Sequence, residues 1–284
     1  MQNSLFNTDE FSDLNSAKVS ISLYKELLGF TKDLKENYLK NVENFENHLS
    51  FNELNESCYL KLYCDIKSID QIKPISSFYD DIPGLKELNS KAIKFFLKPR
   101  NNSIKGLDVQ LGNKYDEILI NFLQSKGIKA ERADTKNKSL PDIMILDSTK
   151  NIKAYIEHKY HHAPFIFSYK LIHRESYEGS ITLDTKKLKK QIVEVESELG
   201  DRPVYVVHWV DFHHLKGIFF NTLEQIKDYL YNEEMAFERK EREGDYKFVH
   251  SQKIKTGYIE KFYPPLHEMG DFKELLDKLT PNVK

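Results

Sequence analysis

The chain has 284 residues, of which 40% are hydrophobic and 30% are charged, and its formal net charge at pH 7 is −2. A chain of this size and composition can bury a substantial core, which excludes an intrinsically disordered protein. The near-balanced charge gives no global basic field, which argues against a protein that coats nucleic acid but is compatible with an enzyme that has a local basic surface.

The first hundred residues are predicted to be mainly helical. Apolar side chains recur at steps of three and four along one predicted long helix, at Leu27, Phe30, Leu34, Tyr38, Val42, Phe45 and Leu49. This face packs either on the protein's own core or against a second subunit. Residues 72–88 contain Pro74, Pro83 and Gly84 and are typical of turns between shorter helices. Cys58 and Cys64 fit no common zinc spacing, so we expect reduced thiols and an intracellular protein.

A polar break around 99–106 is the predicted domain boundary. It separates a helical N-terminal region, 1–105, from a core at 106–232, and a charged, Tyr-rich extension with a short helix near its end follows at 233–284. The mixed-sign run ERKERE at 238–243 predicts an exposed helix.

Inside the core, the pattern changes from helix to an alternation of strands and helices. It predicts a helix ending near Gly127, three strands, a second helix ending at Gly200, a buried strand, and a third helix begun by a capping box of Thr222 and Gln225. The three strands are IKAERA at 128–133, PDIMIL at 141–146 and IKAYIEHK at 152–159; RPVYVVHWVDF at 202–212 is the buried one. The predicted fold class is therefore α/β with an α+β flavour, with a mixed central sheet flanked by helices.

Two carboxylates and an amine are predicted to meet at one edge of this sheet. Side chains two apart share a strand face, so Glu157 and Lys159 point the same way and His158 points the other way. If DSTKN closes a hairpin, Asp142 at the start of one strand lies across from them. The alternative is a surface hairpin with an ordinary ion pair, which contributes little.

Carboxylates this close repel each other, and a divalent cation removes that repulsion. Mg²⁺ favours one or two protein carboxylates, with water and phosphate oxygens completing its shell. A neighbouring lysine can position the attacking water or stabilise the charge of a phosphoryl transition state. This residue set suits the hydrolysis of a phosphodiester.

Pro141-Asp142, a strand-length gap, and Glu157-His158-Lys159 resemble the PD-(D/E)xK signature of restriction-endonuclease-like nucleases. The order of helix, strands, helix and strand over roughly 112–220 is similar to the core of that family. The resemblance implies Mg²⁺ bound by Asp142, Glu157 and the backbone carbonyl of His158. It also implies catalytic help from Lys159 and from an acid on the preceding helix. Asp116 is the better candidate for that acid, because it shares a stripe with Leu119 and Leu123, and Glu117 is the alternative.

Weaker candidates surround this signature. Gln191, on the helix after the motif, is similar to a glutamine that some members of the family carry. Candidate contacts to the DNA backbone are Lys170, Arg174, Lys186 and Lys190, although a solvated helix face explains the lysines of KKLKK equally well. The histidines of HKYHH and His213-His214 lack the spacing of a helix-borne zinc motif. They are better explained by contacts to phosphate or to neighbouring side chains.

The resemblance implies a Mg²⁺-dependent endonuclease, closest in character to a type II restriction enzyme that acts on double-stranded DNA as a homodimer. No GxxxxGK[ST] motif is present, so no nucleotide cofactor is expected. The N-terminus is unlike a signal peptide and no apolar run is long enough to span a bilayer, so we expect a cytoplasmic protein without a membrane partner. The alternatives are a phage-defence or DNA-repair nuclease without sequence specificity, and a nucleic-acid-binding protein that hydrolyses nothing.

Overall fold

The computed structural model describes residues 8–39, 45–96, 107–133, 140–165, 168–172, 181–232, 236–238, 246–255 and 260–280. The central feature is a five-stranded sheet of order β1-β2-β3-β5-β6. Its strands are β1 Lys129–Arg132, β2 Ile143–Leu146, β3 Ile152–His161, β5 Val204–Asp211 and β6 Lys216–Thr222. β3 and β5 are parallel, and the other three pairs are antiparallel. The predicted mixed sheet is thus confirmed.

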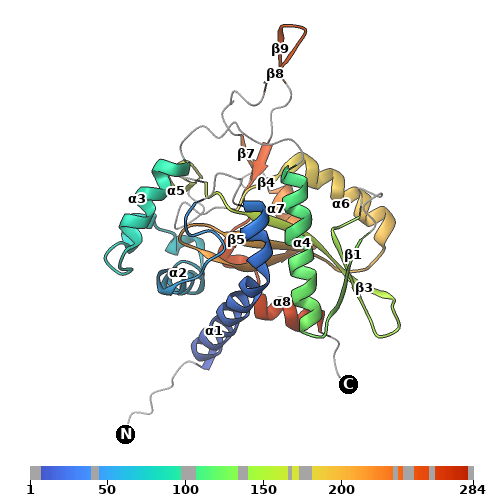
Figure 1. Cartoon of the computed structure of the whole chain (residues 1–284), viewed down its shortest axis with the longest axis horizontal. Helices are drawn as coiled ribbons and strands as arrows, with labels where there is room; N and C mark the ends of the chain where they lie inside the picture. Colours follow the sequence, from blue (N-terminus) through green and yellow to red (C-terminus); the bar gives the residue numbers. More distant parts are fainter. Residues whose placement is uncertain are drawn as a thin grey trace.

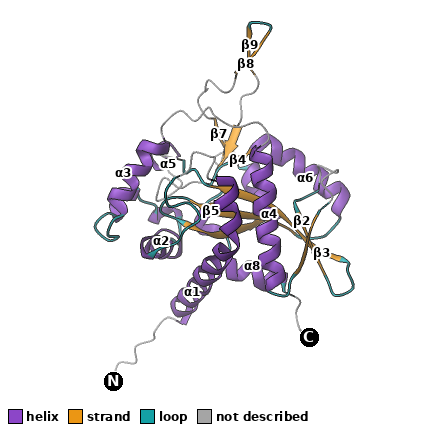
Figure 2. Cartoon of the chain, viewed as in Figure 1, coloured by secondary structure: helices purple, strands orange, loops and turns teal. Residues whose placement is uncertain are grey.

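Helices cover both faces of this sheet (Figures 1 and 2). The described helices are α1 Thr8–Leu28, α2 Glu53–Tyr59, α3 Leu85–Phe96, α4 Leu107–Ser125, α5 Ser168–Ile172, α6 Thr185–Leu199, α7 Leu223–Tyr231 and α8 Phe272–Leu279. Figure 1 shows α4, in green, crossing the sheet with α1 beside it. Side chains of α1, α4 and α8 share one hydrophobic cluster with Ile145, Ile156 and Val207 of the sheet. Because side chains alternate along a strand, Tyr155 and Val206 enter a second cluster with α2, α6 and α7 on the opposite face.

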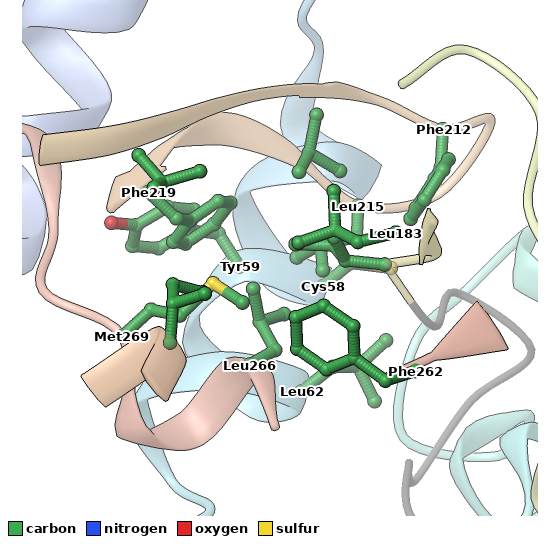
Figure 3. Packing of buried hydrophobic residues seen from close by; sticks show 14 of the residues in the cluster. Cys58, Tyr59, Leu62, Leu183, Phe212, Leu215, Phe219, Phe262, Leu266 and Met269 are labelled. Atoms are coloured by element: carbon green, nitrogen blue, oxygen red, sulfur yellow. The ribbon is translucent and has the colours of Figure 1, made fainter. Parts of the chain in front are cut away.

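The second cluster is drawn in Figure 3. There Cys58, Tyr59 and Leu62 pack with Phe219 of β6 and with Met269. The rings of Tyr59 and Phe219 stack with centroids 5.7 Å apart. Residues from before position 105 therefore complete the cover of the sheet and bury part of its surface.

Two small sheets complete the described strands. β4 Leu183–Asp184, β10 Glu260–Phe262 and β7 Ala236–Glu238 form one, and β8 Tyr246–Val249 pairs with β9 Gln252–Lys255 in the other. Short 3-10 or π-helical segments lie at Gly29–Thr31, Leu34–Tyr38, Leu60–Cys64, Ile69–Gln71, Ile75–Phe78 and Leu266–Glu268.

Local signals placed most core elements correctly. Gly127 and Gly200 follow α4 and α6 with φ angles of 78° and 64°, which glycine adopts without a steric penalty. Thr222 caps α7, and the side chains of Thr222 and Gln225 bond reciprocally to each other's backbone N–H groups. The turn between β2 and β3 is held by Asp147, whose Oδ1 accepts from the backbone N–H groups of Thr149 and Asn151.

The single long helix predicted over residues 22–51 is confirmed only in part, because the described helical turns run to Leu39. Helical structure begins earlier, at Thr8, and changes at Gly29 into short 3-10 and π-helical turns. Residues 45–50 form a turn in which Leu49 has φ 49°, because its backbone N–H bonds to buried Asp211 and its side chain enters the core. Val42 lies outside the described residues.

Other differences concern segments with weak local patterns. β6 was not predicted, because its apolar run of three residues is too short to show alternation; pairing with β5 makes it a strand. β7 to β10 were also missed. The predicted boundary at 99–106 lies outside the described residues. So does most of the predicted ERKERE helix, whose first residue, Glu238, ends β7.

Candidate active site

The β2–β3 hairpin brings Asp142, Glu157 and Lys159 to one edge of the central sheet. Asp142 directly precedes β2, and β2 pairs antiparallel with β3 so that Ile143 lies opposite Ile156. The backbone N–H of His158 donates a hydrogen bond of 2.8 Å to Asp142 Oδ2. The two ends of the PD-(D/E)xK-like motif, 16 residues apart in the sequence, are therefore in direct contact.

Glu157 is held from two sides. It is 5% exposed, and its Oε1 forms an ion pair with Lys159 Nζ on the same face of β3. Its Oε2 accepts a hydrogen bond of 2.5 Å from Gln191 Nε2 of α6. The shared face of Glu157 and Lys159 agrees with strand alternation, and α6 covers that face.

The charges at this edge shift the pKa of two of these groups. Burial raises the pKa of Asp142 to about 6, and the carboxylates of Glu157 and Asp116 add to the rise, while Lys159 and the His158 N–H oppose it. Burial lowers the pKa of Lys159, but the negative charges of Glu157 and Asp142 outweigh it and leave that pKa above its ordinary value. Lys159 is therefore a cation at neutral pH, beside a carboxyl group that ionises with difficulty.

Asp116 approaches the motif from α4, on the other face of β3. Its Oδ1 lies 2.9 Å from His158 Nδ1, and its Oδ2 accepts a bond of 3.2 Å from Arg132 at the end of β1. Glu117, the alternative helix acid, is exposed and pairs with Lys114 at 2.7 Å. Of the two acids, only Asp116 reaches the motif.

Among the described residues, the predicted basic contacts make no hydrogen bond or ion pair with the motif. Lys170 on α5 and Lys186 and Lys190 on α6 are exposed. Lys190 Nζ lies 3.5 Å from Glu194 Oε1, one turn further along α6. Arg174 lies outside the described residues. Gln191 is the one weaker candidate that the described structure joins directly to the motif.

Sequence reasoning missed Arg132. Its guanidinium donates to Asn113 Oδ1 and the Asn113 carbonyl oxygen as well as to Asp116, so it ties β1 to α4 beside the motif. The pairing of β1 with β2 is the signal that points to Arg132, because it puts Arg132 opposite Ile143, the residue next to Asp142. It was overlooked because a single arginine at the end of a short strand has no motif of its own.

His213 and His214 serve the core. His213 Nε2 lies 3.1 Å from Asn89 Oδ1, and the carbonyl oxygens of His213 and His214 accept hydrogen bonds from Asn55. These contacts tie the turn between β5 and β6 to α2 and α3. His213 and His214 thus contact neighbouring side chains, which is one of the two predicted explanations.

Asp142, Glu157 and the His158 carbonyl could offer a metal ion only oxygen ligands. Two carboxylates that repel each other suit Mg²⁺, which keeps several waters and needs few protein ligands. Within the described ranges, no three His, Cys, Asp or Glu side chains are arranged to hold an ion by themselves. The donor set therefore fits a hydrated, open Mg²⁺ site better than a closed protein cage.

No helix among the described residues has the length and apolar character needed to cross a membrane. The sequence matches no protein-family model, and a comparison with curated proteins finds no similar sequence.

Proposed function

We propose that this protein is a Mg²⁺-dependent DNA endonuclease with a restriction-endonuclease-like core. The observation that carries the proposal is the convergence of Asp142, Glu157 and Lys159 on one sheet edge, where burial and Glu157 raise the pKa of Asp142. A buried carboxylate whose pKa is raised by burial and by a second carboxylate is a signal of a functional site, since a metal ion would relieve the repulsion. The succession of α4, β1, β2, β3, α6 and β5 supports the same core.

In this proposal Asp142, Glu157 and the His158 carbonyl hold the ion. Bound Mg²⁺ would lower the pKa of a water and offset negative charge on the phosphoryl oxygens. Gln191 fixes the orientation of Glu157, and Asp116 holds the ring of His158, the residue whose backbone carbonyl is the third proposed ligand. Lys159 stays protonated and stabilises the additional negative charge that develops as water attacks phosphorus.

The expected substrate is double-stranded DNA, and the expected assembly is a homodimer whose two-fold symmetry matches a palindromic site. A type II restriction enzyme is the form of the proposal that we favour. A phage-defence or repair nuclease without sequence specificity, or a binding protein that has lost hydrolysis, would use the same fold differently.

A plasmid digest with Mg²⁺ or with EDTA tests the proposal. We expect cleavage with Mg²⁺ only, and none by the Asp142→Ala and Glu157→Ala variants, which should still bind DNA in Ca²⁺. Discrete bands would support a site-specific enzyme, and a smear would support the non-specific alternative. Binding without cleavage by the wild type would favour the binding protein, and cleavage by Asp142→Ala at the wild-type rate would refute the metal site.

A further inference from the structure

Two histidines and an asparagine form a hydrogen-bonded chain on the sheet face that carries Glu157 and Lys159. His161 Nε2 lies 3.1 Å from His208 Nδ1, and His208 Nε2 lies 3.2 Å from Asn221 Oδ1. His208 and Asn221 are fully buried, whereas His161 is half-buried. None of these three residues is explained by the proposed metal site.

The sheet register places this chain beside Lys159. His161 is two residues beyond Lys159 on β3, so the two side chains share a face. On the adjacent parallel strand, His208 is the register partner of Lys159. The chain therefore begins on the face that would meet the scissile phosphate.

In the orientation that the structure gives the Asn221 amide, the contacts set the tautomers of both rings. Asn221 Oδ1 can only accept, so His208 Nε2 carries the hydrogen and His208 Nδ1 carries the lone pair. His161 Nε2–H then donates to His208 Nδ1, which leaves the lone pair of His161 on Nδ1. Among the described contacts, His161 Nδ1 makes no hydrogen bond. His161 Nδ1 is thus an acceptor of fixed orientation that can accept a proton or a hydrogen bond.

The proposed reaction lacks such an acceptor. Lys159 remains protonated and cannot accept a proton from the attacking water. Asp142 and Glu157 are committed to the ion, and Glu157 also bonds to Lys159 and Gln191. A neutral imidazole on the same face can accept that proton.

We propose that His161 is the general base of this site, and that His208 and Asn221 are positioning residues that orient its ring. The inference rests on the proposed nuclease function. As the water oxygen bonds to phosphorus, its proton passes to His161 Nδ1 and the bond from phosphorus to the 3′ oxygen breaks. The leaving 3′ oxygen takes a proton from solvent, and His161 later returns its own proton to solvent.

The surroundings keep His161 neutral before the reaction. Burial lowers its pKa, and His208, Lys159, His158 and His162 lower it further. The imidazole is consequently in its basic form at neutral pH. An approaching phosphate would offset the charge of Lys159 and so favour proton transfer to His161.

Single-turnover cleavage by His161→Ala, with and without imidazole in the buffer, tests the proposal. General base catalysis contributes about 10²–10⁴-fold, so we expect a loss of at least ~10²-fold with partial recovery in imidazole. Asp142→Ala is the control for imidazole itself and should not recover. His162→Ala is the matched strand control, because His162 stacks on Tyr160 on the opposite face of β3 and should change the rate only slightly.

Activity within a few-fold of wild type in His161→Ala, or a loss that imidazole does not reverse, would overturn the assignment. If the wild type cleaves no DNA, the nuclease proposal fails first. Nitrogen-15 NMR of the imidazole rings then still tests the chain, with His161→Gln assigning the signal. We expect hydrogen on His161 Nε2 and not on Nδ1, and a change in His208→Leu. The reverse tautomer would mean that the Asn221 amide is turned by 180°, and it would also overturn the proposal.

Discussion

The backbone N–H of His158 donates a 2.8 Å hydrogen bond to Asp142 Oδ2, which joins the start of β2 to the middle of β3. This bond holds the Asp142 carboxylate against the chain that carries Glu157 and Lys159. The pKa of Asp142 is nevertheless raised, because burial and the neighbouring carboxylates outweigh Lys159 and the His158 N–H donor. Holding these carboxylates together therefore lowers the free energy of unfolding of the metal-free protein.

Asp142→Asn should stabilise the metal-free protein at pH 8. The folded-state pKa of Asp142, about 6, is above the ordinary 3.8, so its ionised form destabilises the fold above pH 6. Asparagine keeps the acceptor for the His158 N–H without the charge. We expect the free energy of unfolding to rise by about 1–3 kcal/mol at pH 8, and the gain to vanish below about pH 4.

Urea unfolding in EDTA measures this difference. Glu117→Gln removes an exposed carboxylate from the same region and should change the free energy of unfolding by less than about 0.5 kcal/mol. An Asp142→Asn protein that is less stable than wild type at pH 8 would contradict the repulsion argument.

Lys159→Ala should impair the chemical step far more than DNA binding. A charge that acts on the transition state is worth about 3–4 kcal/mol, so single-turnover cleavage should fall by ~10²–10³-fold. DNA affinity in Ca²⁺ should change little. Lys159→Arg should not restore the rate, because a planar guanidinium places its donors differently from an ammonium. Normal cleavage with weakened, less salt-dependent binding would instead make Lys159 a contact to the DNA backbone.

Asp116→Ala and Glu117→Ala should have unequal effects on cleavage. Asp116 bonds to His158 and Arg132, whereas Glu117 bonds to Lys114 at the surface. Loss of a partner of a metal-binding residue typically costs about 10–100-fold, which we expect for Asp116→Ala. Glu117→Ala should cleave at nearly the wild-type rate. Equal and negligible losses in a parallel time course would return Asp116 to an ordinary structural role.

The protein should lose stability as the pH falls from 6.5 towards 4. Burial lowers the pKa of His48 to about 4 and that of His208 and His214 to about 3. In this window the unfolded chain binds protons that the folded chain excludes, so the free energy of unfolding falls with falling pH. Each histidine contributes up to about 1.4 kcal/mol per pH unit.

The raised pKa values of Asp142 and Glu274 act in the opposite direction over part of this range, but they are two groups against three histidines. Urea denaturation at half-unit pH steps between 7.5 and 4.5 measures the net slope. A flat or rising stability towards acid pH would show that these rings are not held neutral.

Gly270→Ala should destabilise the protein, whereas Gly112→Ala should stabilise it. Gly270 pairs with Phe220 through two backbone hydrogen bonds, and a Cβ there would lie 2.2 Å from the Phe220 ring. Moving that ring out of the core costs about 1–3 kcal/mol. A Cβ on Gly112 of α4 meets no atom within 4 Å, and alanine gains about 0.5–1 kcal/mol in a helix. Thermal unfolding of both variants should shift Tm in opposite directions.

The sequence by itself determined the features that depend on neighbours along the chain. The DSTKN turn makes β2 and β3 antiparallel, which brings Asp142 close to the end of β3, and strand alternation puts Glu157 and Lys159 on one face. Tertiary packing decided the rest. Asp116 and Glu117 have the same chemistry on adjacent helix positions, and the placement of α4 on β3 decides which one reaches His158. The contact between His161 and His208 spans 47 residues, and β6 becomes a strand only beside β5. Such contacts depend on which segments pack against each other, which the local pattern of either segment does not specify.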